Sequence, residues 1–201
     1  TGAHIHIQHV TTARGMDTIK WFKDQGVKVT CEVAPHHLYF NETDIQDYDT
    51  NYKMNPPLRT KEDNERLLQG LIDGIFDVIA TDHAPHTDFE KNNDFVSAPF
   101  GITGLETALP SLYHHYIRTG VFGWDLIVKR YSAEPRRILH KDPVPIVEGG
   151  VANFVIFNPG EKSHFTREFM KSRSINTPFY NQELEGRVDE VVFGNDVLLR
   201  R

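Results

Sequence analysis

The stretch AHIHIQHV, residues 3–10, decides the fold class together with two apolar runs that follow it. Its apolar residues alternate with polar ones, which is the pattern of a β-strand. The runs VKVTCEV at 27–33 and DVIAT at 77–81 have the composition of two further buried strands. The question is then what connects these three strands.

Two amphipathic segments separate the predicted strands. Residues 15–26 lie between two glycines and place Ile19, Trp21 and Phe22 at helical spacing. Residues 60–74 open with Thr-x-x-Asp, which resembles a capping box. The apolar residues that this second segment places on one helical face are Leu67, Leu68, Leu71 and Ile72. The order strand, helix, strand, helix, strand predicts parallel βαβ units and an α/β fold.

The character of the chain changes near residue 142. Before it, 102–120 and 123–140 read as helices, with a kink at Pro110 and a break at Pro135 because proline lacks the backbone N–H. After it come short apolar runs split by Gly, Asn and Pro, which predict an antiparallel β appendage. We therefore divide the chain into residues 1–142 and 143–201.

Composition restricts the classes of function. The 201 residues are 39% hydrophobic and 25% charged, which is typical of a soluble globular protein. A net charge of -6 and a pI of about 6.0 argue against a nucleic-acid partner and favour a small ligand. The single cysteine, Cys31, fits a reducing compartment. Without an apolar run near 18 residues or a leader-like start, we expect neither a membrane span nor a signal peptide, and a cytoplasmic location.

Each predicted strand ends in side chains that can bind a ligand. The first strand ends at His9, the second at Glu32 and the third at Asp82. Sites in α/β folds form where the carboxyl ends of parallel strands converge. Period-two alternation puts His9 on the face of Ile5 and Ile7, which we expect to be buried. An imidazole and a carboxylate that point into one cavity suit a divalent metal such as zinc.

Structural interpretations compete with each of these functional ones. His4 and His6 fit hydrogen-bonded core or surface positions, and residues 82–86 fit a turn. Cys31 fits a small buried apolar residue. The stretch NPPLR at 55–59 fits a rigid turn, which is also how a site holds a side chain still.

Five motifs closely resemble bacterial-type dihydroorotases of the amidohydrolase superfamily. They are HVTT at 9–12, CEVAPHH at 31–37, KMNPPLR at 53–59, ATDHAPH at 80–86 and APFGITGLET at 98–107. The tail at 149–159 and 175–188 is also similar to that family. The resemblance implies a (β/α)8 TIM barrel, of which residues 1–142 would supply strands six to eight, and a small β-sandwich that includes residues 143–201.

The resemblance also implies the site residues. His9 would bind one zinc ion of a binuclear centre, and Asp82 would bind the other and carry the proton. Glu32 matches an acidic position near the metals of some relatives, which makes it a further candidate ligand. His86 and Asn55 would hold the substrate's carboxylate and ring, with the backbone of Phe100 and Gly101 closing over them. His86 favours dihydroorotase over hydantoinase or allantoinase, whose substrates lack this carboxylate.

The implied reaction is reversible hydrolysis of the cyclic amide of dihydroorotate to carbamoyl aspartate, in a protein that is a homodimer when intact. The family also needs a His-x-His-x-Arg motif, a carboxylated lysine or aspartate, and a further histidine, none of which can be placed in these residues. We therefore expect a C-terminal portion that alone binds zinc weakly and is inactive. The alternatives are another cyclic amidase, or a non-catalytic subunit that scaffolds aspartate transcarbamoylase.

Overall fold

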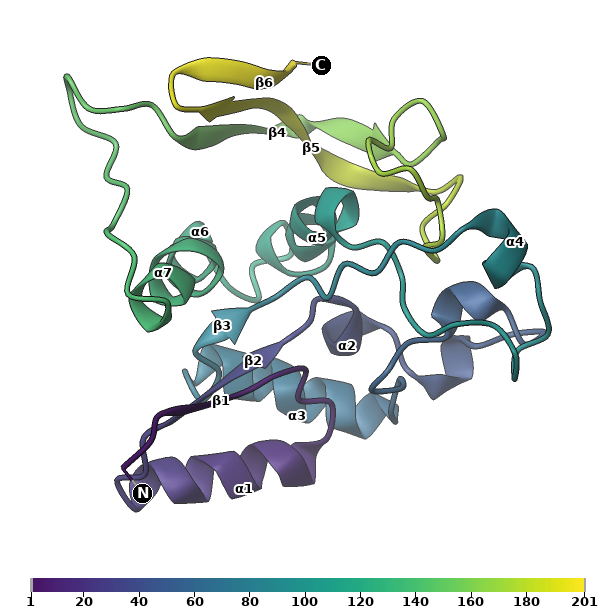
Figure 1. Cartoon of the computed structure of the whole chain (residues 1–201), viewed down its shortest axis with the longest axis horizontal. Coiled ribbons are helices and arrows are strands. Elements are labelled where there is room, and N and C mark those ends of the chain that lie inside the picture. Colours follow the sequence, from purple (N-terminus) through teal and green to yellow (C-terminus); the bar gives the residue numbers. More distant parts are fainter. Residues whose placement is uncertain (1, 201) are drawn as a thin grey trace.

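Three short parallel strands form the sheet that the sequence predicts. Figure 1 shows the computed structural model of the chain, which describes residues 2–200. Strands β1 (Ile5–Ile7), β2 (Val29–Val33) and β3 (Val78–Ile79) pair in that order, and both pairings are parallel. Helix α1 (Ala13–Asp24) connects β1 to β2, and helix α3 (Lys61–Ile72) lies between β2 and β3. The predicted α/β class and its βαβ units are confirmed.

The two connecting helices begin at side-chain caps. Thr12 Oγ1 accepts a hydrogen bond from the amide of Gly15 at 3.1 Å, and Thr60 Oγ1 accepts one from the amide of Asp63 at 3.2 Å. Such caps satisfy amide groups that the first turn of a helix leaves without a partner. The predicted apolar face of α3 is largely confirmed, but Ile72, its last residue, is 39% exposed.

Strand β2 separates the helix-covered core from the opposite face of the sheet. Cys31 and Val33 are completely buried and pack against residues of α1 and α3. Burial raises the pKa of the Cys31 thiol to about 11, so it stays protonated and serves as a small apolar core residue. Thr30 and Glu32 alternate with these residues and point to the opposite face, where the polar side chains of β1 lie.

Short elements and loops surround the sheet ends. Between β2 and α3 lie α2 (His36–Tyr39), η1 (Glu42–Asp44) and η2 (Thr50–Tyr52). The single-turn helix α4 (Asp88–Lys91) follows β3, and α5 (Leu105–Leu112) then continues through Pro110 into the π-helical turn η3 (Tyr113–Ile117). An isolated parallel bridge joins His83 to Ile102, which holds the loop after β3 beside the segment that precedes α5.

The predicted break at Pro135 does not occur. The chain passes from α6 (Trp124–Ile127) through the π-helical η4 (Val128–Ala133) directly into α7 (Glu134–Ile138). Pro135 lies in the first turn of α7, directly after the π-helical turn. The wider π-helical turn before it leaves room for the ring that would clash with an ordinary α-helical carbonyl.

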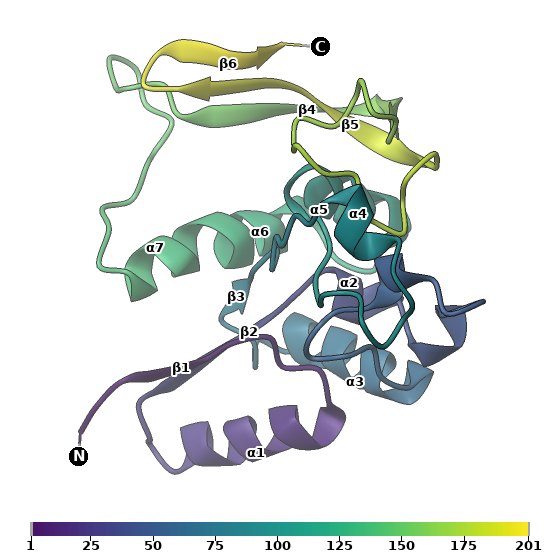
Figure 2. The same ribbon diagram turned by 45° about the vertical axis from the view of Figure 1, so that its right-hand side comes forward.

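The C-terminal residues form a separate antiparallel sheet, as predicted. Strand β5 (Glu183–Phe193) is central and pairs with β4 (Phe154–His164) and β6 (Asp196–Arg200). Figures 1 and 2 show helices α5 to α7 between this sheet and the parallel one. The approach of η3 to β5 is close, because a Cβ at Gly186 would lie 2.4 Å from the ring atoms of Tyr113 and Phe157.

Candidate functional site

His9 and Asp82 meet at the carboxyl ends of β1 and β3. Nε2 of His9 lies 3.5 Å from Oδ1 of Asp82, and both side chains are about three-quarters buried, with 24% and 22% exposed. Both residues have positive φ angles, 51° and 50°, which are uncommon for residues other than glycine. These left-handed residues turn the chain where the strands end, and the two side chains converge as the sequence predicts.

The predicted face of His9 is wrong. Ile5 and Ile7 are 53% and 38% exposed in this chain, and His9 does not lie on their face of the sheet. His9 instead contacts Glu32, the same carboxylate that His6 contacts on the opposite face of the sheet. Alternation fails because β1 ends at Ile7 and the left-handed backbone at His9 reverses the side-chain direction.

Glu32 lies between two imidazoles. Its Oε2 is 2.9 Å from His6 Nε2, and its Oε1 is 3.0 Å from His9 Nδ1. The second contact has the distance of an ion pair, but neither atom forms a hydrogen bond of normal geometry. The contact of Glu32 with Nδ1 leaves Nε2 of His9 facing Asp82.

His4 and His6 belong to the same polar face of the sheet. Nε2 of His4 and Nδ1 of His6 lie 3.0 Å and 2.8 Å from Thr30 Oγ1. These contacts match the interpretation of the two histidines as hydrogen-bonded residues, with His4 exposed and His6 half-buried. They also continue the chain of polar contacts that reaches His9 through Glu32.

Asp82 is in an environment that favours its protonated form. Burial raises the pKa of its carboxyl above the ordinary value, His9 opposes this shift, and the charge of Glu32 adds to it. A carboxyl whose pKa is raised in this way is a stronger base once ionised. Asp82 is therefore suited to exchange protons with a substrate.

The buried pair His36 and His37 supports the neighbouring loop. His37 is 2% exposed, and its Nε2 donates to the carbonyl oxygen of Pro56 at 2.9 Å. Burial lowers the pKa of His37 to about 4 and that of His36 well below its ordinary range, so both rings are neutral at pH 7. His37 thus fixes the turn that presents Asn55, whose side chain is exposed.

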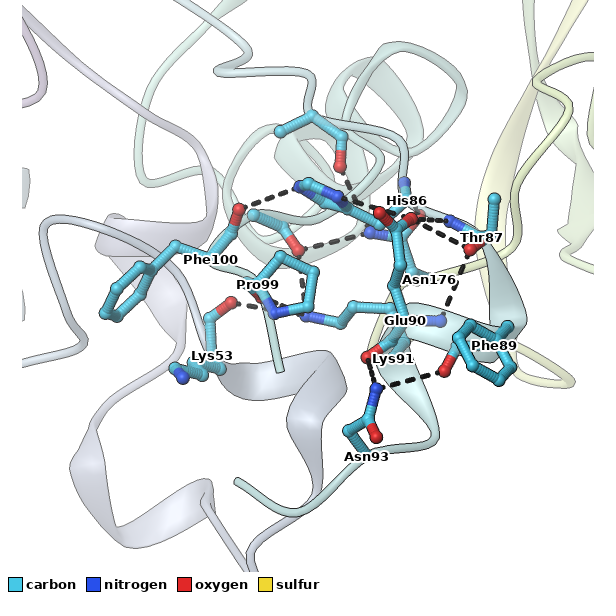
Figure 3. Close-up of polar contacts among 12 residues, drawn as sticks. Lys53, His86, Thr87, Phe89, Glu90, Lys91, Asn93, Pro99, Phe100 and Asn176 are labelled. Atoms are coloured by element: carbon cyan, nitrogen blue, oxygen red, sulfur yellow. Dashed lines mark hydrogen bonds and ion pairs between the residues drawn. The ribbon is translucent and has the colours of Figure 1, made fainter. Parts of the chain in front are cut away.

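His86 and the Phe100–Gly101 backbone form a second group of predicted site residues (Figure 3). Nε2 of His86 donates to the carbonyl oxygen of Phe100 at 2.9 Å, and its Nδ1 lies 3.9 Å from Oε2 of Glu90. Gly101 has a φ of 126°, and its amide donates to the carbonyl oxygen of Lys53 at 2.9 Å. The structure therefore brings His86, Phe100 and Gly101 together.

Two buried lysines, which the sequence analysis did not identify, donate hydrogen bonds to backbone carbonyl oxygens of the loop at 96–101. Lys53 Nζ donates to the carbonyl oxygens of Val96 and Ala98 at 2.8 and 2.5 Å. Lys91 Nζ donates to those of Pro99 and Gly101 at 3.2 and 3.1 Å. Burial lowers the pKa of Lys91 to about 8, and the charge of Lys53 adds to this. Lys53 belongs to the KMNPPLR motif, which could have drawn attention to it. Lys91 lies outside the five motifs, and no local sequence pattern indicates its burial.

The zinc-binding prediction can be compared with the side chains present. Within residues 2–200, no group of three or more His, Cys, Asp or Glu side chains is arranged to hold a metal ion. His9 Nε2 and Asp82 Oδ1 are nitrogen and oxygen donors of the kind that zinc accepts, and they face each other. They fit part of a ligand set, since zinc usually takes four ligands.

Comparison with known proteins identifies the relatives of this chain. No protein-family model matches it. It is 44% identical over 96% of its length to the dihydroorotase of Caldanaerobacter subterraneus, and 42% identical over 92% to that of Anoxybacillus flavithermus. By sequence, the chain is a relative of the dihydroorotases. It spans less than half of these two proteins, 44% of each.

The fold has a counterpart among solved structures. A solved structure, the dihydropyrimidinase from Brevibacillus agri, superposes with a TM-score of 0.89, covering 99% of this chain and 45% of that one at 24% identity. This similarity concerns the fold, since few residues are shared. Among the described residues, none of the helices of this dihydroorotase relative is long and apolar enough to cross a membrane.

Proposed function

We propose that this chain is part of a zinc-dependent dihydroorotase, which hydrolyses the cyclic amide of dihydroorotate reversibly to carbamoyl aspartate. The observation that carries this proposal is the convergence of His9 Nε2 and Asp82 Oδ1 at 3.5 Å from two strand ends. The identity of 42–44% with dihydroorotases over most of the chain supports it.

In this proposal, β1, β2 and β3 are strands six to eight of a (β/α)8 barrel. Residues 1–142 are then part of the barrel, and residues 143–201 belong to a small β-sandwich. The exposed Ile5 and Ile7 support this, because they line an apolar groove of about 750 Å³ beside β1. Such a groove is expected where a further element of an α/β fold covers a parallel strand.

The chain's residues divide the proposed chemistry among them. His9 and Asp82 would hold zinc, with Glu32 as a further candidate ligand or as the group that orients His9. When bound, zinc acidifies water and polarises a substrate carbonyl. Asp82 would take the proton from the attacking water as it adds to the ring carbonyl, and would return that proton to the ring nitrogen that leaves.

Substrate recognition is proposed for the second group. His86 would bind the carboxylate of dihydroorotate, Asn55 the ring, and the backbone at Phe100 and Gly101 would close over both. Because Phe100 O accepts from His86 Nε2, the imidazole is already oriented. Prior orientation lowers the entropy cost of binding.

For the complete protein we propose a cytoplasmic homodimer, with aspartate transcarbamoylase as a candidate partner. A non-catalytic subunit of aspartate transcarbamoylase is the alternative, and co-purification of that partner would favour it. Another cyclic amidase is the second alternative.

The test is to assay the full-length protein against dihydroorotate, hydantoin and allantoin. We expect turnover of dihydroorotate in preference to the other two. His86→Gln should raise the KM for dihydroorotate roughly tenfold, because the imidazole N–H that donates to the carboxylate is lost, whereas the exposed His140→Gln should change nothing. Preference for hydantoin or allantoin would reject the proposal.

A further inference from the structure

A buried asparagine of the C-terminal segment connects the two loops of the proposed substrate site. Asn176 is 3% exposed and lies in the connection between β4 and β5, far in sequence from His86 and Gly101. Its Nδ2 donates to the carbonyl oxygens of Ala84 and Gly101, both at 3.1 Å. Its Oδ1 accepts from the amide of His86 at 3.2 Å. Figure 3 shows Asn176 beside His86.

These contacts use both donors and one of the two acceptor lone pairs of the Asn176 amide. A carboxamide provides two N–H donors and an acceptor oxygen, and here both donors reach carbonyls and the oxygen reaches an amide. Aspartate has nearly the same shape but no donor when ionised, and it would face two carbonyl oxygens. The two carbonyl oxygens therefore require a side chain with N–H donors, which asparagine has and ionised aspartate lacks.

The carbonyl of Gly101 is where the contacts concentrate. It accepts from Asn176 Nδ2 and from Lys91 Nζ, each at 3.1 Å, which occupies both of its lone pairs. A Cβ at Gly101 would lie 2.4 Å from Cβ of Ala84, so the two loops touch without an intervening side chain. Small movements of one loop must therefore move the other.

The backbone of Asn176 is itself held in place. Its carbonyl oxygen accepts from the amide of Thr103 at 2.9 Å. The surrounding segment packs an apolar cluster of Phe165, Met170, Phe179 and Leu184 against Tyr39 and Phe40, which lie at the end of α2. The backbone hydrogen bond and the apolar cluster thus fix the position of the Asn176 side-chain amide.

We propose that Asn176 is a positioning residue that fixes the His86 imidazole relative to the Phe100–Gly101 backbone, and so sets the geometry in which the site holds the carboxylate of a cyclic amide. This inference rests on the proposed function of His86. It assigns a role in the site to the INTPFYN stretch at 175–181, although that segment lies outside the parallel sheet.

The experiment compares Asn176→Asp and Asn176→Ala with a matched control in the full-length protein. Ser163→Ala is the control, because Ser163 is fully buried and its Oγ donates to the carbonyl oxygen of Gly186 at 2.8 Å, within the C-terminal sheet. The measurements are KM and kcat for dihydroorotate, affinity for orotate by calorimetry, and hydrogen exchange of segments 83–87 and 99–104.

We expect both Asn176 variants to raise the KM and weaken orotate binding roughly tenfold or more, with a smaller change in kcat. Exchange should rise in both segments together, whereas Ser163→Ala should lower thermal stability and leave these readouts unchanged. Wild-type KM and exchange in both Asn176 variants would overturn the inference. If the wild type does not hydrolyse dihydroorotate, the proposed function fails, and the exchange data still decide whether Asn176 couples the loops.

Discussion

Nε2 of His9 lies 3.5 Å from Oδ1 of Asp82, and each residue follows the end of a strand and has a left-handed backbone conformation. Such conformations cost roughly 1–3 kcal/mol each for residues other than glycine. Strain of this kind is concentrated at functional sites, where surrounding structure maintains it. The occurrence of a left-handed residue after both β1 and β3 therefore supports a shared site at these two strand ends.

The first prediction concerns Asp82 as the proton carrier. Asp82→Asn in the full-length protein should lower kcat by roughly 10²- to 10⁴-fold, because an amide cannot exchange the proton. Circular dichroism should show an unchanged fold. Asp17→Asn is the control, since Asp17 is half exposed and pairs with Arg66 at 2.7 Å. Comparable activity in Asp82→Asn and wild type would remove Asp82 from the mechanism.

The second prediction concerns His9 as a metal ligand. His9→Gln should lower the zinc content of the purified full-length protein and weaken zinc affinity by at least about tenfold, as measured by elemental analysis and chelator competition. His164, an exposed residue of β4, provides the control His164→Gln, which should keep full occupancy. Unchanged zinc content in His9→Gln would show that His9 is not a ligand.

The third prediction separates backbone strain from steric clash at Gly101. Gly101→Ala should lower the free energy of unfolding by about 1–3 kcal/mol and raise the KM, because φ is 126° and the new Cβ meets Ala84 at 2.4 Å. Gly120→Ala is the matched control, with φ at 77° and nothing within 4 Å of a Cβ. Equal losses in the two variants would mean that the contact with Ala84 is unimportant.

The fourth prediction concerns the pH dependence of stability. Burial lowers the pKa of His115 to about 4, and its ring stacks on Tyr39 at 4.7 Å. Between pH 4 and 6.5 the unfolded chain binds the proton more readily, so His115 makes stability rise as pH rises through this range. His115→Phe should keep the stacking and remove this contribution, on the order of 1 kcal/mol after allowing for partial exposure.

The measurement for His115 is thermal unfolding at pH 5 and pH 7. We expect the variant to gain most over the wild type at pH 5 and least at pH 7. An identical difference between the two proteins at both pH values would mean that His115 does not titrate in this range.

Local sequence patterns were sufficient for much of the fold. The three strands, the cap of α3 and the buried face of Leu67 and Leu71 follow from short-range rules that act within a few residues. The convergence of His9 and Asp82 also agrees with the prediction, although the reasoning from alternating faces failed.

By itself, the sequence determined the parallel α/β framework and which strand ends carry polar side chains, because periodicity and chain order are local properties. Only the tertiary structure decided the direction of the His9 side chain, the burial of Lys53 and Lys91, and the hydrogen bond from Asn176 to the carbonyl oxygen of Gly101. These depend on left-handed backbone angles and on hydrogen bonds between distant segments. No local period records such bonds, because their partners become neighbours only when the chain has folded.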